Sequence, residues 1–121
     1  MTTIQGCNKY ENGPLMSLRT RKERMANTWI IENYKKNGKD LTSYYNGYLE
    51  TFTKNGDYSY VWENISGTGE WSFDGNDQDI KIVGALNQSN QTITLLKLEE
   101  KRMWYYYMDG DDKKEFHMKA N

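Results

Sequence analysis

Residues 48–62 read Tyr-Leu-Glu-Thr-Phe-Thr-Lys-Asn-Gly-Asp-Tyr-Ser-Tyr-Val-Trp, and this stretch decides the fold. After Asp57 an aromatic residue occupies every second position, which is the side-chain period of a β-strand. Residues 48–53, before the turn, fit a second strand. Between the two lies Asn55-Gly56, a dipeptide that accepts the positive φ angles of a tight hairpin. The stretch therefore predicts a pair of antiparallel strands at 48–53 and 58–62.

Similar segments on both sides of this hairpin predict six more strands. They are short, rich in aromatic and β-branched residues, and bounded by turn sequences such as Asn37-Gly38 and Asp109-Gly110. Connections of only a few residues make sequential strands antiparallel. These strands are predicted at 29–34, 70–73, 80–83, 92–98, 103–108 and 114–119, with residues 67–69 as a turn.

Only one helix is predicted, at 17–27. Thr20-Arg21-Lys22-Glu23 fits a capping box, and Asn27 can adopt the left-handed conformation that ends a helix. We therefore expect an all-β fold: an eight-stranded antiparallel up-and-down barrel preceded by one short N-terminal helix. Closure into a barrel removes the sheet edges that would otherwise pair with other chains.

The length of 121 residues suits a single domain. Residues 1–16 show no period and contain Gly6, Gly13 and Pro14, so we expect them to form a flexible tether. Residues 17–121 then form the barrel domain. Ten Tyr, four Trp and three Phe supply its core, because a buried aromatic side chain removes about 150–250 Å² from water.

Composition argues against several kinds of chemistry. Cys7 is the only cysteine and His117 the only histidine, which disfavours a disulfide, a thiolate metal cluster and a Cys–His nucleophile pair. Glu115 shares a strand face with His117, but no nucleophile or oxyanion site accompanies them. The 16 basic and 17 acidic side chains nearly cancel, which disfavours nucleic acid as a partner. We expect no catalytic residue, no metal and no cofactor.

Three short motifs occur in an order and at spacings that are typical of one family. They are Asn27-Thr28-Trp29, where the family usually has Gly-x-Trp, residues 52–60 as Phe-x-x-x-Gly-x-Tyr-x-Tyr, and Gly69-Glu70-Trp71 as a second Gly-x-Trp. On these motifs the chain resembles the lipocalin-like domain of small secreted or lipid-anchored proteins from bacteria related to Bacteroides and Cytophaga. The resemblance implies a barrel whose mouth holds a small apolar ligand.

The main functional question is whether the barrel interior is empty or filled. Eight strands enclose a space that is either packed with side chains or holds one small ligand. Our first hypothesis is a non-enzymatic protein that binds a small, partly apolar ligand in the barrel mouth. The alternative is a filled barrel that acts as a structural or protein-interaction module. Nothing in the sequence singles out a pair of carboxylates for acid–base chemistry, although four acidic residues could approach one another: Glu50, Asp57, Glu63 and Glu70. The ligand-binding residues predicted by alternation are Tyr60, Trp62, Trp71, Tyr105 and Tyr107.

Residues 103–108 are apolar or aromatic on both faces of their strand. If Met103, Tyr105 and Tyr107 face inward, then Trp104 and its neighbours face outward. Either adjacent side chains cover this outer face, or it is a patch for a partner protein.

Cys7 follows Ile4-Gln5-Gly6, which resembles the processing site of a bacterial lipoprotein with Cys7 as the lipid anchor. The resemblance to anchored proteins supports a location in the cell envelope. Residues 1–40 carry eight basic and four acidic groups, and such an excess could face anionic lipid or simply be a solvated helix face. Six residues before Cys7 are too few for a signal peptide. Either the true start therefore lies upstream of Met1, or the protein is cytoplasmic and Cys7 is an ordinary free thiol.

Overall fold

A computed structural model of the chain describes residues 20–76, 78–86 and 89–121. The predicted tether, Cys7 and the start of the predicted helix lie outside these ranges. The elements are α1 (Arg21–Met25), β1 (Asn27–Lys36), β2 (Lys39–Asp40), the 3-10 helix η2 (Thr42–Tyr45), β3 (Leu49–Phe52), β4 (Asp57–Trp62), β5 (Ile65–Phe73), β6 (Asp79–Leu86), β7 (Ser89–Leu98), β8 (Arg102–Asp109) and β9 (Asp112–Ala120).

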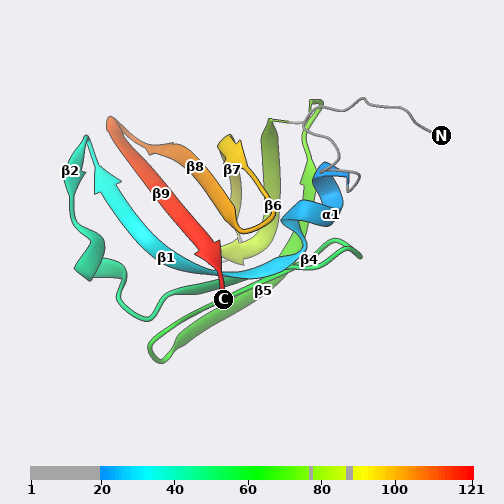
Figure 1. The fold of residues 1–121 in the computed structure, drawn as a ribbon, viewed down its shortest axis with the longest axis horizontal. Coiled ribbons are helices and arrows are strands. Elements are labelled where there is room, and N and C mark those ends of the chain that lie inside the picture. Colours follow the sequence, from blue (N-terminus) through cyan, green and yellow to red (C-terminus); the bar gives the residue numbers. More distant parts are fainter. Residues whose placement is uncertain (1–19, 77, 87–88) are drawn as a thin grey trace.

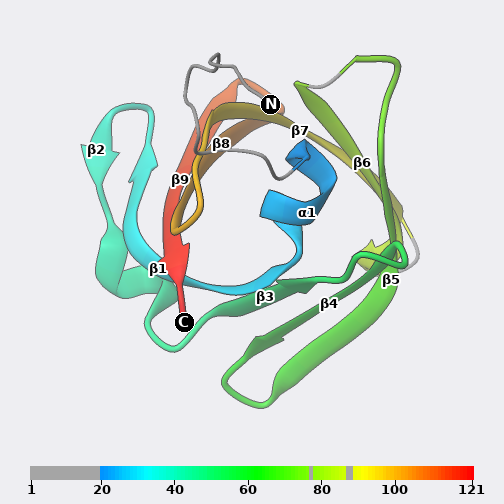
Figure 2. The same ribbon diagram turned by 45° about the vertical axis from the view of Figure 1, so that its right-hand side comes forward.

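The strands form the predicted eight-stranded up-and-down barrel. Each strand from β3 to β9 pairs with its sequential neighbour, β3 pairs with β1, and β1 closes the barrel by pairing antiparallel with β9. The two residues of β2 only extend the edge of β1. Because consecutive strands are antiparallel, their turns alternate between two ends. In Figures 1 and 2, α1 lies at one end and the β2–η2 segment at the other.

The α1 helix closes the first end of the barrel. Thr20 and Glu23 form the predicted capping box, but the helix ends at Met25 and not at Asn27, which is the first residue of β1. Met25 is fully buried, and its carbonyl oxygen accepts a hydrogen bond of 3.1 Å from the indole Nε1 of Trp29. Arg24 donates to the carbonyl oxygen of Leu98 at 3.2 Å, which ties α1 to the end of β7.

A β-bulge in β1 brings two core aromatics to the same side. Trp29 and Tyr34 are five residues apart, so strict alternation would point them to opposite faces. The register with β9 shifts between Ile31 and Asn33, and the extra residue restores the inward direction. Both side chains are buried as a result.

Two Asn-Gly pairs form turns of different kinds. Asn37 and Gly38 both have positive φ (54° and 81°), as a two-residue type I′ hairpin requires, and they join β1 to β2. In the predicted hairpin between β3 and β4, only Gly56 has positive φ (93°), and its amide donates to the carbonyl oxygen of Thr53. The loop there, residues 53–56, is two residues longer than a two-residue turn.

Residues 67–69 form part of β5, where the sequence predicted a turn. Gly67 pairs with Tyr60 and Gly69 pairs with Tyr58 across the β4–β5 ladder. Side chains directly opposite one another in such a ladder share a face. The glycines therefore leave interior space beside the two inward-facing phenol rings, which a larger residue would occupy.

Candidate functional site

A cavity of about 210 Å³ lies inside the barrel at the end opposite α1, which we call the mouth. Its position follows from its lining, which includes η2 and both strands beside the β4–β5 turn. Ile65, next to that turn, is half exposed, so the cavity reaches the surface there. The lining is aromatic (Tyr45, Tyr48, Tyr58, Tyr60, Trp62, Tyr105, Tyr107), aliphatic (Ile65, Ile82, Ile93) and polar (Glu50, Gln91).

Four of the five residues predicted to line the mouth do so: Tyr60, Trp62, Tyr105 and Tyr107. They come from β4 and β8, which lie on different sides of the barrel. Alternation within each strand directs them inward, as expected.

Trp71 points inward but does not line the cavity. Its indole Nε1 donates to the carbonyl oxygen of Thr53 at 2.8 Å, and its ring packs edge-on against Phe52 and Phe73. Thr53 begins the β3–β4 turn, which lies at the α1 end. Alternation decides which face a side chain takes, whereas the register of neighbouring strands decides its height along the barrel.

The barrel interior is filled with side chains at the α1 end and open at the mouth. The filled interior and the cavity that the sequence left as alternatives therefore each describe one end of the barrel. Beneath α1 the space is packed by Met25, Trp29, Met103 and Met118, all with zero solvent exposure. Phe116, in the middle of β9, stacks on Tyr105 and Tyr107 with ring centroids 4.9 and 5.7 Å apart. Beyond this layer the cavity remains.

Among the described residues, Glu50 is the one charged residue that is buried in the core, and it lines the cavity. Only 3% of its surface is exposed. Its Oε1 accepts a hydrogen bond of 2.6 Å from the Tyr105 hydroxyl, and its Oε2 accepts one from the Tyr58 hydroxyl. Tyr48 lines the same cavity. Two phenols, one from β4 and one from β8, therefore converge on one carboxyl group.

The electrostatics of this cluster follow from its burial. Burial raises the pKa of the Glu50 carboxyl, and the hydrogen bonds from Tyr105 and Tyr58 oppose that rise only in part. Burial, followed by the nearby charge of Glu50, raises the pKa of the Tyr58 and Tyr105 hydroxyls above their ordinary values. The phenols therefore stay protonated and remain hydrogen-bond donors.

Glu50 is the site residue that the sequence prediction missed. A signal for it was present, because Tyr48, Glu50 and Phe52 alternate along one strand and the two aromatics are typical core residues. A glutamate between them shares their inward face. A count of the acidic residues could not reveal that Glu50 points inward, because a count does not say on which face of its strand each side chain lies.

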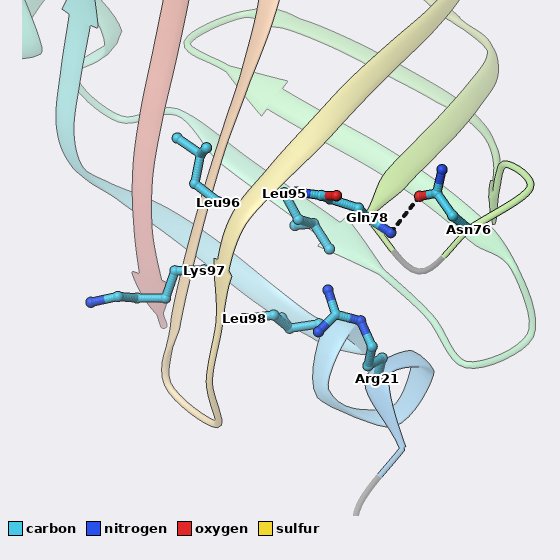
Figure 3. A pocket seen from close by; sticks show the side chains of 7 residues that line it. All are labelled: Arg21, Asn76, Gln78, Leu95, Leu96, Lys97 and Leu98. Atoms are coloured by element: carbon cyan, nitrogen blue, oxygen red, sulfur yellow. Dashed lines mark hydrogen bonds between the residues drawn. The ribbon is translucent and has the colours of Figure 1, made fainter.

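A second hollow, of about 450 Å³, lies on the outer surface beside α1 (Figure 3). Arg21 of α1 points toward β7. The backbone amide of Gln78 donates a hydrogen bond of 2.7 Å to Asn76 Oδ1 in the turn before β6. Gln78 and Leu96 in its wall are exposed. This hollow lacks the buried carboxyl and the ring-lined walls of the interior cavity, so we take the interior cavity as the site.

On the outer face of β8, neighbouring side chains cover Trp104, whereas Met108 is half exposed. The Trp104 ring stacks on His117 at 3.8 Å, and Lys97 Nζ lies 3.9 Å from the Trp104 ring centroid. His117 Nε2 in turn lies 2.7 Å from Glu115 Oε2. Cover by neighbouring side chains, the first of the two alternatives for this face, therefore describes Trp104.

The described residues contain no group of three or more His, Cys, Asp or Glu side chains arranged to hold a metal ion. In the same part of the chain, no helix is long and apolar enough to cross a membrane.

The chain has the lipocalin-like barrel fold that the resemblance implied. It is similar to a crystal structure of a lipocalin-like protein from Bacteroides uniformis, with a TM-score of 0.64 and 14% identity over 81% of this chain and 99% of that one. It is also similar to an uncharacterized protein from Bacteroides eggerthii, with a TM-score of 0.60 and 14% identity over 80% and 99% of the two chains. No family model and no curated protein matches the sequence. These similarities establish the fold, and the function must be argued from the cavity.

Proposed function

We propose that this protein binds a small, partly apolar ligand in the barrel mouth and catalyses no reaction. The observation that carries the proposal is the cavity itself, walled by tyrosine and tryptophan rings with one buried carboxyl group among them. Binding sites combine mostly apolar walls with a few placed polar groups in this way. The barrel fold is a scaffold suited to such a role, although fold alone does not assign function.

The volume limits the size of the ligand. A dry apolar cavity of roughly 150 Å³ binds benzene. A cavity of about 210 Å³ therefore holds one ring with a short side chain, or an aliphatic group of similar size. Long-chain lipids are too large to lie within it.

Titration with small aromatic and aliphatic compounds should change the fluorescence of Trp62, whose ring lines the cavity. Replacing Ile93 with phenylalanine should weaken binding by about tenfold or more, because a single methylene misfit in an apolar pocket is worth roughly 10–200-fold. Leu96→Phe is the matched control, since Leu96 lies on the same strand but is exposed. Trp71→Phe removes a fluorophore outside the cavity and should leave the saturable signal intact.

The absence of any saturable change with either compound class would contradict ligand binding. It would favour the alternative, a barrel that acts through its surface as a structural or protein-interaction module. Equal loss of binding in Ile93→Phe and Leu96→Phe would place the bound compound outside the cavity.

We also propose that the protein is held in the cell envelope by a lipid on Cys7. The support is the Ile4-Gln5-Gly6-Cys7 motif, together with the resemblance to anchored proteins. The chain enters the barrel at the α1 end, so a tether from Cys7 would leave the mouth at the far end. Mass spectrometry of the protein from cell membranes should show acyl chains on Cys7, and Cys7→Ser should release the protein. An unmodified thiol on a protein found in the soluble fraction would favour the cytoplasmic alternative.

A further inference from the structure

The Glu50 carboxylate has hydrogen-bond donors but no counter-charge. No Lys, Arg or His of the described residues forms an ion pair with it, and the groups that act on it are all phenols. A buried carboxylate is costly unless it is both hydrogen-bonded and paired with a positive charge. In this barrel the first condition is met and the second is not.

Glu50 lines the cavity, so a bound molecule can supply the missing charge. A metal ion would need further ligands, and the described lining of the cavity adds only phenols and the side-chain amide of Gln91. An anionic ligand would be repelled by the carboxylate. A neutral ligand would leave the charge uncompensated.

The rings around the carboxylate also favour a cation. Tyr45 stacks on Trp62 with centroids 4.9 Å apart, and Tyr48 meets Trp62 at 86° with centroids 6.5 Å apart. The Tyr60 ring centroid lies 6.3 Å from that of Tyr48, the residue just before β3. Ring faces attract cations electrostatically, and organic ammonium groups are recognised by aromatic cages of this kind.

We propose that the ligand is a small organic ammonium ion. Its nitrogen pairs with the Glu50 carboxylate, and its apolar part lies against the rings of Tyr60 and Trp62. This inference rests on the proposed function, since it names the chemical class of ligand for the same cavity. The volume of about 210 Å³ admits an amine that carries a single ring.

Three probes of one shape and different charge test the inference: 2-phenylethylammonium, 2-phenylethanol and 3-phenylpropionate. Calorimetry at neutral pH should show the ammonium ion binding at least about tenfold more tightly than the alcohol, because a hydrogen bond to a charged group contributes roughly 1.5–3 kcal/mol, or about 10–150-fold. The propionate should bind most weakly. Glu50→Gln keeps the shape and should bring the affinities for ammonium and alcohol within about twofold of each other.

Glu115→Gln is the matched control, because Glu115 lies on the outer face of β9 beside His117 and should leave all three affinities unchanged. If Glu50→Gln fails to fold, the charge series on the unaltered protein still decides the matter. Equal affinities for the ammonium ion and the alcohol would overturn this inference while leaving the proposed function standing. No binding of any probe at millimolar concentration would overturn both.

Discussion

Replacing Trp29 with alanine should lower the free energy of unfolding by about 3–5 kcal/mol, the usual cost of truncating a fully buried large aromatic. Trp29 has zero solvent exposure and lies where β1 pairs with both β3 and β9, so it touches the seam that closes the barrel. Its indole also holds the carbonyl oxygen of Met25 at the end of α1. The substitution should therefore loosen the helix as well as the core.

Trp29→Phe separates these two effects. It keeps a ring in the core but removes the indole donor, so part of the loss should come from smaller volume and about 1 kcal/mol from the missing hydrogen bond. Urea denaturation followed by circular dichroism measures both variants. A loss below 1 kcal/mol for Trp29→Ala would mean that this end of the barrel is not packed as described.

The strands were predictable because their physical cause is local. Apolar side chains alternate with polar or smaller ones along short segments such as Tyr58-Ser59-Tyr60-Val61-Trp62, because every second side chain of a strand points into the barrel interior. The same local logic found the capping box of Thr20 and Glu23, whose bonds span a single turn. Each of these patterns requires no knowledge of what lies opposite in space.

The features that were missed depend on non-local geometry. Trp71 faces inward as predicted, but its height in the barrel depends on the register with β4, which alternation does not encode. Glu50 sits in the core only because Tyr58 and Tyr105, 8 and 55 residues away, supply its donors. The end of the helix was misplaced for a similar reason, because the pairing of Asn27 with Phe52 claims that residue for β1.

The pH dependence of stability should distinguish the native protein from Glu50→Gln. Burial raises the pKa of Glu50 above its ordinary value of 4.5, so the folded chain holds this proton more tightly than the unfolded chain does. The stability contributed by protonated Glu50 is complete below pH 4.5 and is lost as pH rises through the pKa of the folded state. Each tenfold difference in proton affinity between the two states corresponds to about 1.4 kcal/mol.

Glutamine has no proton to lose, while its amide can still accept from one phenol and donate to the other. The free energy of unfolding of Glu50→Gln minus that of the native protein should therefore be constant below pH 4.5 and rise above it to a higher plateau. The other titrating groups are common to both chains and largely cancel, including Tyr48, Tyr58 and Tyr105, whose hydroxyls face the carboxyl group. Urea denaturation from pH 3 to pH 8 gives this curve.

A bound ammonium ion should change that curve in a defined way. It compensates the charge of Glu50, so saturating 2-phenylethylammonium should stabilise the native protein more on the upper plateau than below pH 4.5. Glu50→Gln should gain little at either pH. The result that contradicts the prediction is a difference in the free energy of unfolding between the two proteins that stays constant from pH 3 to pH 8. It would mean that Glu50 is not a buried carboxyl group that titrates, and both the pH prediction and the choice of ligand depend on that group.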